Sequence, residues 1–211
     1  MFGPPGSGKG TQGARLSARL RVPHISTGDI LREARAAGTE LGRRAADFMD
    51  RGNLVPDAVM VAVVADRLGK PDCAGGFVLD GFPRTVAQAE SLRQALDAAR
   101  LALQHVVSLQ VPEDEIVRRL TGRLTCRSCG RPWPESGEQA ALGRCTCGGA
   151  LGSREDDRPD AVKRRLEVYA SQTEPLIEWY RRHCLLREVD GTGDADAVFA
   201  RLNHELSGAA A

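Results

Sequence analysis

The chain has 211 residues, which is the size of one domain with room for small insertions. Its net charge of +1 argues against a partner bound through overall charge, such as nucleic acid or an anionic membrane. Hydrophobic residues make up 42% of the chain, enough for a real core, and no apolar run is long enough to span a bilayer. No secretory leader precedes the first motif, so we expect a cytoplasmic protein whose six cysteines form no disulfides.

Helical and strand-like segments alternate along the chain, and glycine or proline bounds most of them. Short apolar strands are expected at 22–25, 77–79, 105–111 and 185–189. After a first helix that begins near residue 10, further helices are expected at 29–36, 40–50, 57–68, 85–99, 112–124, 159–182 and 194–206. This alternation implies an α/β fold, a parallel sheet with helices on both faces. The stretch 125–153 lacks such a pattern and resembles an inserted module, and the tail 207–211 is expected to fray.

The segment from Gly3 to Lys9 reads GPPGSGK and has the spacing of a phosphate-binding loop, G-x-x-x-x-G-K. Glycines allow the positive φ angles that turn backbone N–H groups around a polyphosphate. Lys9 adds a cation, and the helix behind it directs its positive end at the same charge. The hydroxyl that usually follows the lysine arrives one place later, as Thr11. A flexible Gly/Pro tail is the alternative, against which the helical pattern after the loop argues.

Only Met1 and Phe2 precede this loop, where a buried strand normally fixes the direction of the chain. A central strand pairs on both sides, and each unpaired buried backbone group costs about 1–3 kcal/mol. We therefore expect the natural protein to begin a few residues upstream with an apolar strand. An inactive nucleotide-binding relic is the alternative interpretation.

Asp80 ends an apolar strand, at the edge where open parallel sheets place their ligands. A carboxylate there can hold Mg²⁺, directly or through water, beside the phosphate loop, although an Asp that only begins a turn is the structural alternative. Arginines recur at the ends of the predicted elements, where planar guanidinium groups suit the oxygens of a moving phosphoryl group. They are Arg32, Arg84, Arg119, Arg123, Arg154 and Arg165. For any single arginine a solvated surface position is the simpler interpretation, but together they suggest two phosphorylated ligands.

Several motifs, in order along the chain, resemble the adenylate kinase family. They are GPPGSGKGTQ at 3–12, ISTGDILR at 25–32, GNLVPD at 52–57, DGFPRT at 80–85, TGRLTC at 121–126, REDD at 154–157, KRRLEVY at 163–169 and VDGTGD at 189–194. The resemblance implies a P-loop nucleoside monophosphate kinase that reversibly transfers the terminal phosphoryl group of ATP to AMP, giving two ADP. It also implies a core at 1–25, 56–122 and 155–211, a helical AMP-binding arm at 26–55 and a lid at 123–154.

The resemblance implies a role for each matching residue. The ATP phosphates would be held by Gly6, Ser7, Gly8, Lys9, Gly10 and Thr11, and the rest of ATP by Arg119, Arg123, Gly191 and Thr192. AMP would be held by Thr27, Arg32, Leu54, Val55, Gly81, Arg84, Gln88, Arg154 and Arg165, with Gln88 reading the adenine edge. The transferred group would be clamped by Lys9, Arg84, Arg123, Arg154 and Arg165. Asp80 would hold, through water, the Mg²⁺ that accompanies ATP, and ATP and AMP would be the ligands of a monomer.

Two close pairs of cysteines, Cys126-x-x-Cys129 and Cys145-x-Cys147, lie in the inserted module. Four thiolates at such spacing can close a tetrahedral zinc site, which would organise a segment too short for its own core. The lid of many bacterial adenylate kinases is similar, although its second pair is usually C-x-x-C and is here one residue shorter. A disulfide and idle thiols are the alternatives.

Four further residues are expected to be structural. Asp156 and Asp157, just beyond the module, are expected to be hinge and cap residues, and Cys73 and Cys184 to be core fillers.

Two other functions remain open at this point. A kinase for UMP or CMP, or one that uses GTP, would share these motifs. A zinc-ribbon nucleic-acid-binding protein would share the cysteines, but the near-neutral charge and the 4% of aromatic residues argue against it.

Overall fold

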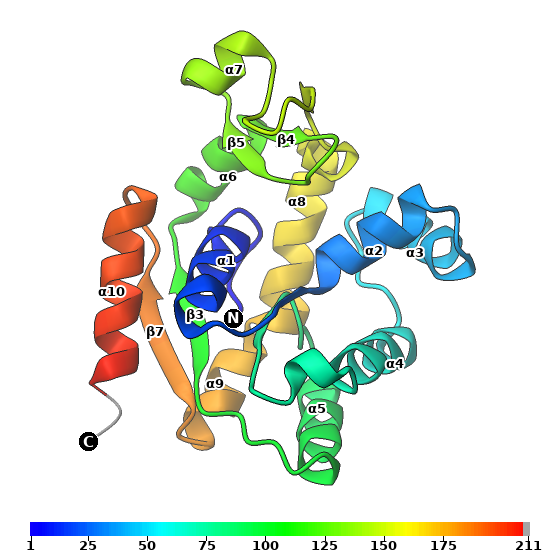
Figure 1. Ribbon diagram of the computed structural model, residues 1–211, viewed down its shortest axis with the longest axis vertical. Coiled ribbons are helices and arrows are strands. Elements are labelled where there is room, and N and C mark those ends of the chain that lie inside the picture. Colours follow the sequence, from blue (N-terminus) through cyan, green and yellow to red (C-terminus); the bar gives the residue numbers. More distant parts are fainter. Residues whose placement is uncertain (209–211) are drawn as a thin grey trace.

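The structure is a computed structural model that describes residues 1–208. Two pairs of parallel strands form its centre, and helices surround them (Figure 1). One pair is β1 (His24–Ser26) with β2 (Val78–Asp80), and the other is β3 (Val106–Gln110) with β7 (Leu186–Asp190). The parallel strands and their helical cover confirm the α/β class expected from the sequence.

Most of the predicted helices begin close to their expected first residues, and side-chain caps mark several of these starts. Ser26 accepts a hydrogen bond from the backbone N–H of Asp29, and Thr85 accepts one from that of Gln88. In chain order the helices are α1 (Lys9–Leu20), α2 (Thr27–Ala36), α3 (Glu40–Asp50), α4 (Asp57–Leu68), α5 (Val86–Ala98), α6 (Glu113–Thr121), α7 (Glu138–Leu142), α8 (Pro159–Val168), α9 (Pro175–Arg182) and α10 (Ala195–Ser207).

Met1 and Phe2 lie between the two strand pairs and hydrogen-bond to both. On one side the N–H of Phe2 donates to the carbonyl oxygen of Val107 at 2.8 Å. On the other side the Met1 ammonium donates to the carbonyl oxygen of Leu79 at 2.5 Å. The N–H of Gly81 donates to the carbonyl oxygen of Met1 at 3.4 Å. These two residues therefore supply part of the pairing that a longer strand would give to β2 and β3.

Helices cover both faces of the β3–β7 pair, because successive strand residues point in opposite directions. Val107 packs in one apolar cluster with Leu16 of α1 and Leu202 of α10. Its neighbour Val106 packs in another cluster, with Leu176 of α9. The core is thus a layer of strands between α1 and α10 on one face and α5 and α9 on the other.

The single helix expected over 159–182 is wrong. α8 ends at Val168, a π-helical turn follows, and α9 begins at Pro175. Proline lacks a backbone N–H and its ring crowds the preceding turn, which explains the break. Thr173 in this turn donates its hydroxyl hydrogen to the carbonyl oxygen of Arg84 at 2.9 Å, so the break also ties α8 and α9 to the start of α5.

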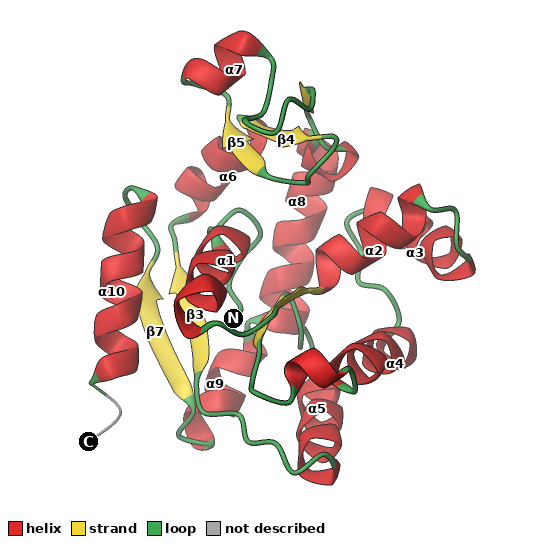
Figure 2. Ribbon diagram, in the orientation of Figure 1, coloured by secondary structure: helices red, strands yellow, loops and turns green. Residues whose placement is uncertain are grey.

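The helix expected over 112–124 also ends early, at Thr121, because the chain there enters a small antiparallel sheet. This sheet consists of β4 (Arg123–Cys126), β5 (Pro132–Pro134) and β6 (Leu151–Gly152). It stands at the top of the molecule in Figure 1, with α7 above it, and α2 and α3 project from the core at one side. Figure 2 shows that its strands are separate from those of the core.

The C-terminal tail was expected to fray, but Ser207 is the last residue of α10. The rest of that prediction, at 209–211, falls outside the described residues. Within residues 1–208 no helix has both the length and the apolar character needed to cross a membrane.

Candidate functional site

The glycine-rich loop before α1 has the conformation that its sequence predicts. Gly6 and Gly8 adopt φ angles of 81° and 94°, which side chains rarely tolerate. The hydroxyl oxygen of Ser7 is buried without a hydrogen-bond partner among the described residues. The first N–H groups of α1 also have no partner within the helix. The loop therefore presents donors that suit the oxygens of a phosphate chain.

Lys9 reaches back across this loop. Its ammonium group donates to the carbonyl oxygens of Gly3 and Pro4 at 2.9 and 2.8 Å. Burial lowers its pKa to about 7, and nearby arginines contribute in the same direction while Asp80 opposes them. An anion beside Lys9 would restore its full charge.

Asp80 ends β2 next to the first turn of α1, as the sequence predicts. Its side chain is close to His24, whose Nε2 lies 3.7 Å from Oδ2, and a Cβ on Gly10 would lie 3.4 Å from the same oxygen. Burial alone would raise the pKa of this carboxyl, but His24, Lys9 and the N-terminal ammonium lower it below its usual range. An ionised, nearly buried carboxylate beside the phosphate loop fits a hard cation such as Mg²⁺.

A cavity opens between the α2–α3 arm and the core. Its walls contain the residues expected to hold a nucleoside monophosphate: Thr27, Arg32, Gly81, Arg84, Gln88 and Arg165, with Leu54 and Val55. Arg154 is the one predicted member that does not line it. Other lining residues were not among those expected from the sequence, such as Leu31, Met49, Asn53, Met60 and Asp156. For the apolar ones, the helical spacing gives no signal beyond ordinary core packing.

Lys9 and five arginines form a cluster of positive charge: Arg32, Arg84, Arg123, Arg154 and Arg165. Burial lowers the pKa of Arg84 to about 10, with Arg165 and Arg32 adding to the effect. Burial likewise lowers the pKa of Arg154 to about 10, with Arg32 and Arg123 adding to it. Cations held this close together stabilise a bound anion, because its charge relieves their mutual repulsion.

Two neighbouring carboxylates, those of Asp156 and Asp157, hold Arg123 and Arg165 in position. Asp157 accepts from Arg123 Nε and Nη2 at 2.7 and 2.5 Å and from Arg165 at 3.1 Å. Asp156 forms an ion pair with Arg165 at 3.1 Å. The expectation that these acids include a helix cap is wrong, because Arg158 occupies the N-cap of α8. The acids instead hold guanidinium groups that local sequence rules do not bring together.

Arg119 and the segment after β7 meet beside the phosphate loop. The Nη2 of Arg119 donates to the carbonyl oxygen of Gly191 at 3.1 Å, and Thr192 follows directly. A Cβ on Gly191 would lie 3.4 Å from the carbonyl oxygen of Ser7. The three residues expected at the ATP base therefore lie together beside the loop.

The four lid cysteines converge. Their Sγ atoms all lie within 4.8 Å of one another, with Cys126 3.5 Å from Cys147 and Cys129 3.6 Å from Cys145. Zinc–sulfur bonds of about 2.3 Å in a tetrahedron place sulfurs about 3.8 Å apart. This arrangement fits a zinc ion, and the distances exclude disulfides in this state.

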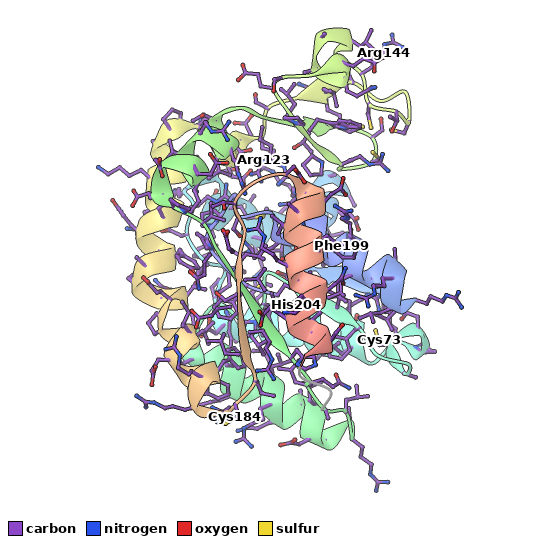
Figure 3. All side chains as sticks on the ribbon, turned by 90° about the vertical axis from the view of Figure 1, so that its left-hand side faces the viewer. Cys73, Arg123, Arg144, Cys184, Phe199 and His204 are labelled. Atoms are coloured by element: carbon purple, nitrogen blue, oxygen red, sulfur yellow. The ribbon has the colours of Figure 1, made fainter. Side chains whose placement is uncertain are left out.

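Hydrogen bonds to sulfur support the shorter second pair. The Nε1 of Trp133 donates to Cys145 Sγ at 3.4 Å. The backbone N–H of Cys147 and this indole, against the effect of burial, lower the pKa of Cys145 to about 6. A C-x-C pair can thus still present a thiolate to a metal. Arg144, which precedes it, lies exposed on the lid (Figure 3).

The two remaining cysteines differ. Cys73 is buried, as expected of a core filler, but that expectation is wrong for Cys184. Cys184 is exposed in a turn after α9, at the opposite end of the molecule from the lid, whose first residue, Arg123, is also labelled (Figure 3). A positive φ of 56° at Cys184 turns the chain into β7.

Known proteins match this chain over most of its length. A family model described as adenylate kinase matches residues 1–185. An adenylate kinase of Archaeoglobus fulgidus is 48% identical over 96% of this chain and 94% of its own length. One from Thermodesulfovibrio yellowstonii is 49% identical over 94% of each chain, and one from Desulfitobacterium hafniense is 50% identical over 94% of this chain and 92% of its own.

Proposed function

The chain belongs to the adenylate kinase family and is a kinase that transfers the terminal phosphoryl group of ATP to AMP, and we propose how its own residues divide this task. The observation that carries the proposal is the cluster of cations between the phosphate loop and the arm cavity. Two anionic ligands, one on each side, would share it. Neither UMP/CMP nor GTP chemistry is favoured by the relatives, nor is an inactive relic.

The donor, ATP, binds at the loop before α1. Backbone N–H groups from Gly6 to Thr11 and the free hydroxyl of Ser7 hold its phosphates. Lys9 exchanges its two carbonyl partners for phosphate oxygens. Arg119, Gly191 and Thr192 support the base, because they lie together beside the loop.

The acceptor, AMP, binds in the cavity under the arm. Arg84 holds its phosphate with Arg32 and Arg165, since all three line the cavity. Thr27, Gly81, Leu54 and Val55 enclose the nucleoside. Gln88 contacts the edge of the base.

Phosphoryl transfer requires neutralisation of charge on the moving oxygens more than it requires an acid or a base. Arg123 and Arg165, braced by Asp157, lie between the two ligands together with Lys9 and Arg84. Arg154 is held by the hydroxyl of Thr125 at 2.9 Å and joins them from the lid side. Mg²⁺ bound with ATP would add charge to the same oxygens, with Asp80 as its nearest protein carboxylate.

The lid is a zinc-organised segment in this proposal. Cys126, Cys129, Cys145 and Cys147 would hold one ion, which stabilises the small β4–β5–β6 sheet. The core (1–25, 56–122, 155–211), the arm (26–55) and the lid (123–154) would then move as three parts during the reaction. The monomeric state and the cytoplasmic location stay predictions.

A panel of nucleotide pairs tests the proposal. Purified protein is mixed with Mg²⁺ and either ATP with AMP, ATP with UMP or CMP, or GTP with AMP, and the products are separated by ion exchange. We expect two ADP for each AMP consumed, and much slower turnover of the other pairs. Faster phosphorylation of UMP or CMP than of AMP contradicts the assigned acceptor, and no turnover of any pair contradicts the proposed function.

A further inference from the structure

The side-chain amide of Gln88 is held between two groups of opposite hydrogen-bonding character. Its Nε2 donates to Asp57 Oδ1 at 2.6 Å, and its Oε1 accepts from the backbone N–H of Arg84 at 2.8 Å. Gln88 is 1% exposed and forms part of the wall of the arm cavity. Among the described residues, the amide nitrogen has a second N–H left to donate, and the amide oxygen has a second lone pair left to accept.

These two partners fix which way the amide points. A carboxylate only accepts, and a backbone N–H only donates. If the amide turned over, its oxygen would face Asp57 and its nitrogen would face the N–H of Arg84. Both contacts would become repulsive in a buried position, so only one orientation is compatible with the structure.

Asp57 is itself held in place. It lies in the first turn of α4, and its second oxygen accepts from the hydroxyl of Thr85 at 2.9 Å. Thr85 caps α5 by accepting from the backbone N–H of Gln88 at 3.1 Å. These hydrogen bonds, one of them from the backbone of Gln88, close a ring of three residues that joins α4 to α5, so Asp57 has no freedom to follow a turning amide.

An amide that cannot turn can distinguish two kinds of purine. A 6-aminopurine presents an acceptor at N1 and a donor at its amino group, which pair with the free N–H and the free lone pair of Gln88. A 6-oxopurine presents a donor at N1 and an acceptor at O6, which is the reverse pattern. It could pair only with a turned amide.

We propose that Asp57 sets the acceptor specificity of this enzyme for a 6-aminopurine over a 6-oxopurine, as a positioning residue that acts through Gln88. The proposal rests on the placement of the AMP base at Gln88. Asp57 need not touch the substrate, because the penalty for the wrong base arises from the buried amide and its two partners.

The test compares AMP with IMP, which differs from AMP only at N1 and position 6. The variant Asp57→Asn keeps the shape of the side chain but offers both a donor and an acceptor, so a turned amide regains one of its two bonds. We expect the ratio of kcat/KM for AMP to that for IMP to fall about tenfold or more, mainly through faster turnover of IMP. Asp196→Asn, which removes an exposed carboxylate from the first turn of α10, is the matched control and should leave the ratio unchanged.

A purely structural role for Asp57 would lower both rates together and leave the ratio unchanged, and that result overturns the proposal. Where turnover is too slow to measure, calorimetry gives the dissociation constants of AMP and IMP for the unmutated protein and for Asp57→Asn. The ratio of these constants is then compared in place of the kcat/KM ratio. Should Asp57→Asn fail to fold, Asp57→Ser removes the carboxylate with a smaller group, and the same fall in the ratio is required. An unmutated enzyme that uses IMP as readily as AMP contradicts this inference alone, whereas one that uses neither contradicts the proposed function.

Discussion

Arg84 is the residue on which the acceptor site most depends. Its Nε donates to the carbonyl oxygen of Gly81 at 2.8 Å, which aims the guanidinium into the cavity beside Arg165. A planar fork in this position can bind two phosphate oxygens at once, which an ammonium cannot.

Replacing Arg84 by Lys keeps the charge and removes the fork. We expect kcat/KM for AMP to fall by about tenfold or more, equivalent to about 1.4 kcal/mol of transition-state stabilisation. Arg93→Lys is the control, because Arg93 lies on α5, the helix that follows Arg84, with its side chain 56% exposed. Unaltered steady-state kinetics for both nucleotides in Arg84→Lys would remove Arg84 from the site.

The lowered pKa of Lys9 predicts that ATP binding depends on pH. Its pKa of about 7 in the free protein means that much of the ammonium is neutral near pH 8, whereas bound phosphates favour the charged form. The bound-state pKa is therefore the higher one, so binding takes up protons, and ATP affinity falls as pH rises above 7.

Calorimetry in buffers of different ionisation enthalpy measures this proton uptake directly. At pH 8 we expect uptake of a large fraction of one proton per MgATP, and its loss in Lys9→Met. Lys70→Met, at an exposed position, should keep it. Absence of any uptake by the unmutated protein would show that Lys9 is already charged before ATP binds.

Among the elements, the lid sheet depends on four cysteine sulfurs, and the indole of Trp133 holds one of them in position. Trp133 on β5 donates to Cys145 Sγ, in the pair that is one residue shorter than usual. Groups that hydrogen-bond to metal ligands commonly change metal affinity by about 10–100-fold. We expect a loss within that range in Trp133→Phe.

Competition with a chromogenic chelator measures the zinc affinity of this variant. The control is Trp179→Phe, because Trp179 is the other tryptophan of the chain and lies on α9. Equal affinities in the two variants would remove Trp133 from the metal site. Protein purified without added metal should contain about one zinc per chain by elemental analysis, and metal-free protein with four alkylatable thiols in the lid would contradict the zinc site itself.

The sequence predicts most elements because each is specified locally. The loop glycines, the caps at Ser26 and Thr85, and the alternation of apolar segments all act within a few residues. The break at Tyr169–Thr173 was missed because apolar spacing continues through it, although Pro175 was the available signal.

The site was predicted less completely, for a different reason. The motifs predicted that Arg84, Arg123 and Arg165 belong to the site, but they did not predict which residues hold these side chains in position. Asp157 meets Arg123 from 34 residues away, and Asp57 meets Gln88 from 31 residues away. Such pairs depend on how helices pack against each other, which no local pattern encodes.

Across the whole molecule, Met1 and Phe2 together connect the two strand pairs, and the phosphate loop follows directly after Phe2. Phe2 as a whole residue is 3% exposed, and it packs with Leu176 and Tyr180 of α9. The backbone of the same residue pairs with β3. The position of the phosphate loop relative to the core therefore depends on this side chain.

Truncation of Phe2 should lower the stability of the whole fold. We expect Phe2→Ala to reduce the free energy of unfolding by about 3–5 kcal/mol, as is typical of buried phenylalanines. Phe48→Ala, at a site 37% exposed, should cost about 1 kcal/mol or less. Urea denaturation followed by circular dichroism compares the two, and equal losses would mean that Phe2 does not anchor the core.

In the proposed mechanism, one cluster of cations serves two nucleotides, ATP at the loop and AMP under the arm. A crystal structure with AMP and a non-transferable ATP analogue would show both phosphate groups at once. We expect the AMP phosphate within about 2.7–2.9 Å of the Arg84 guanidinium, and the terminal phosphate of the analogue in contact with Lys9 and Arg123. AMP bound outside the arm cavity, or the two phosphates separated by a region without arginines, would contradict it.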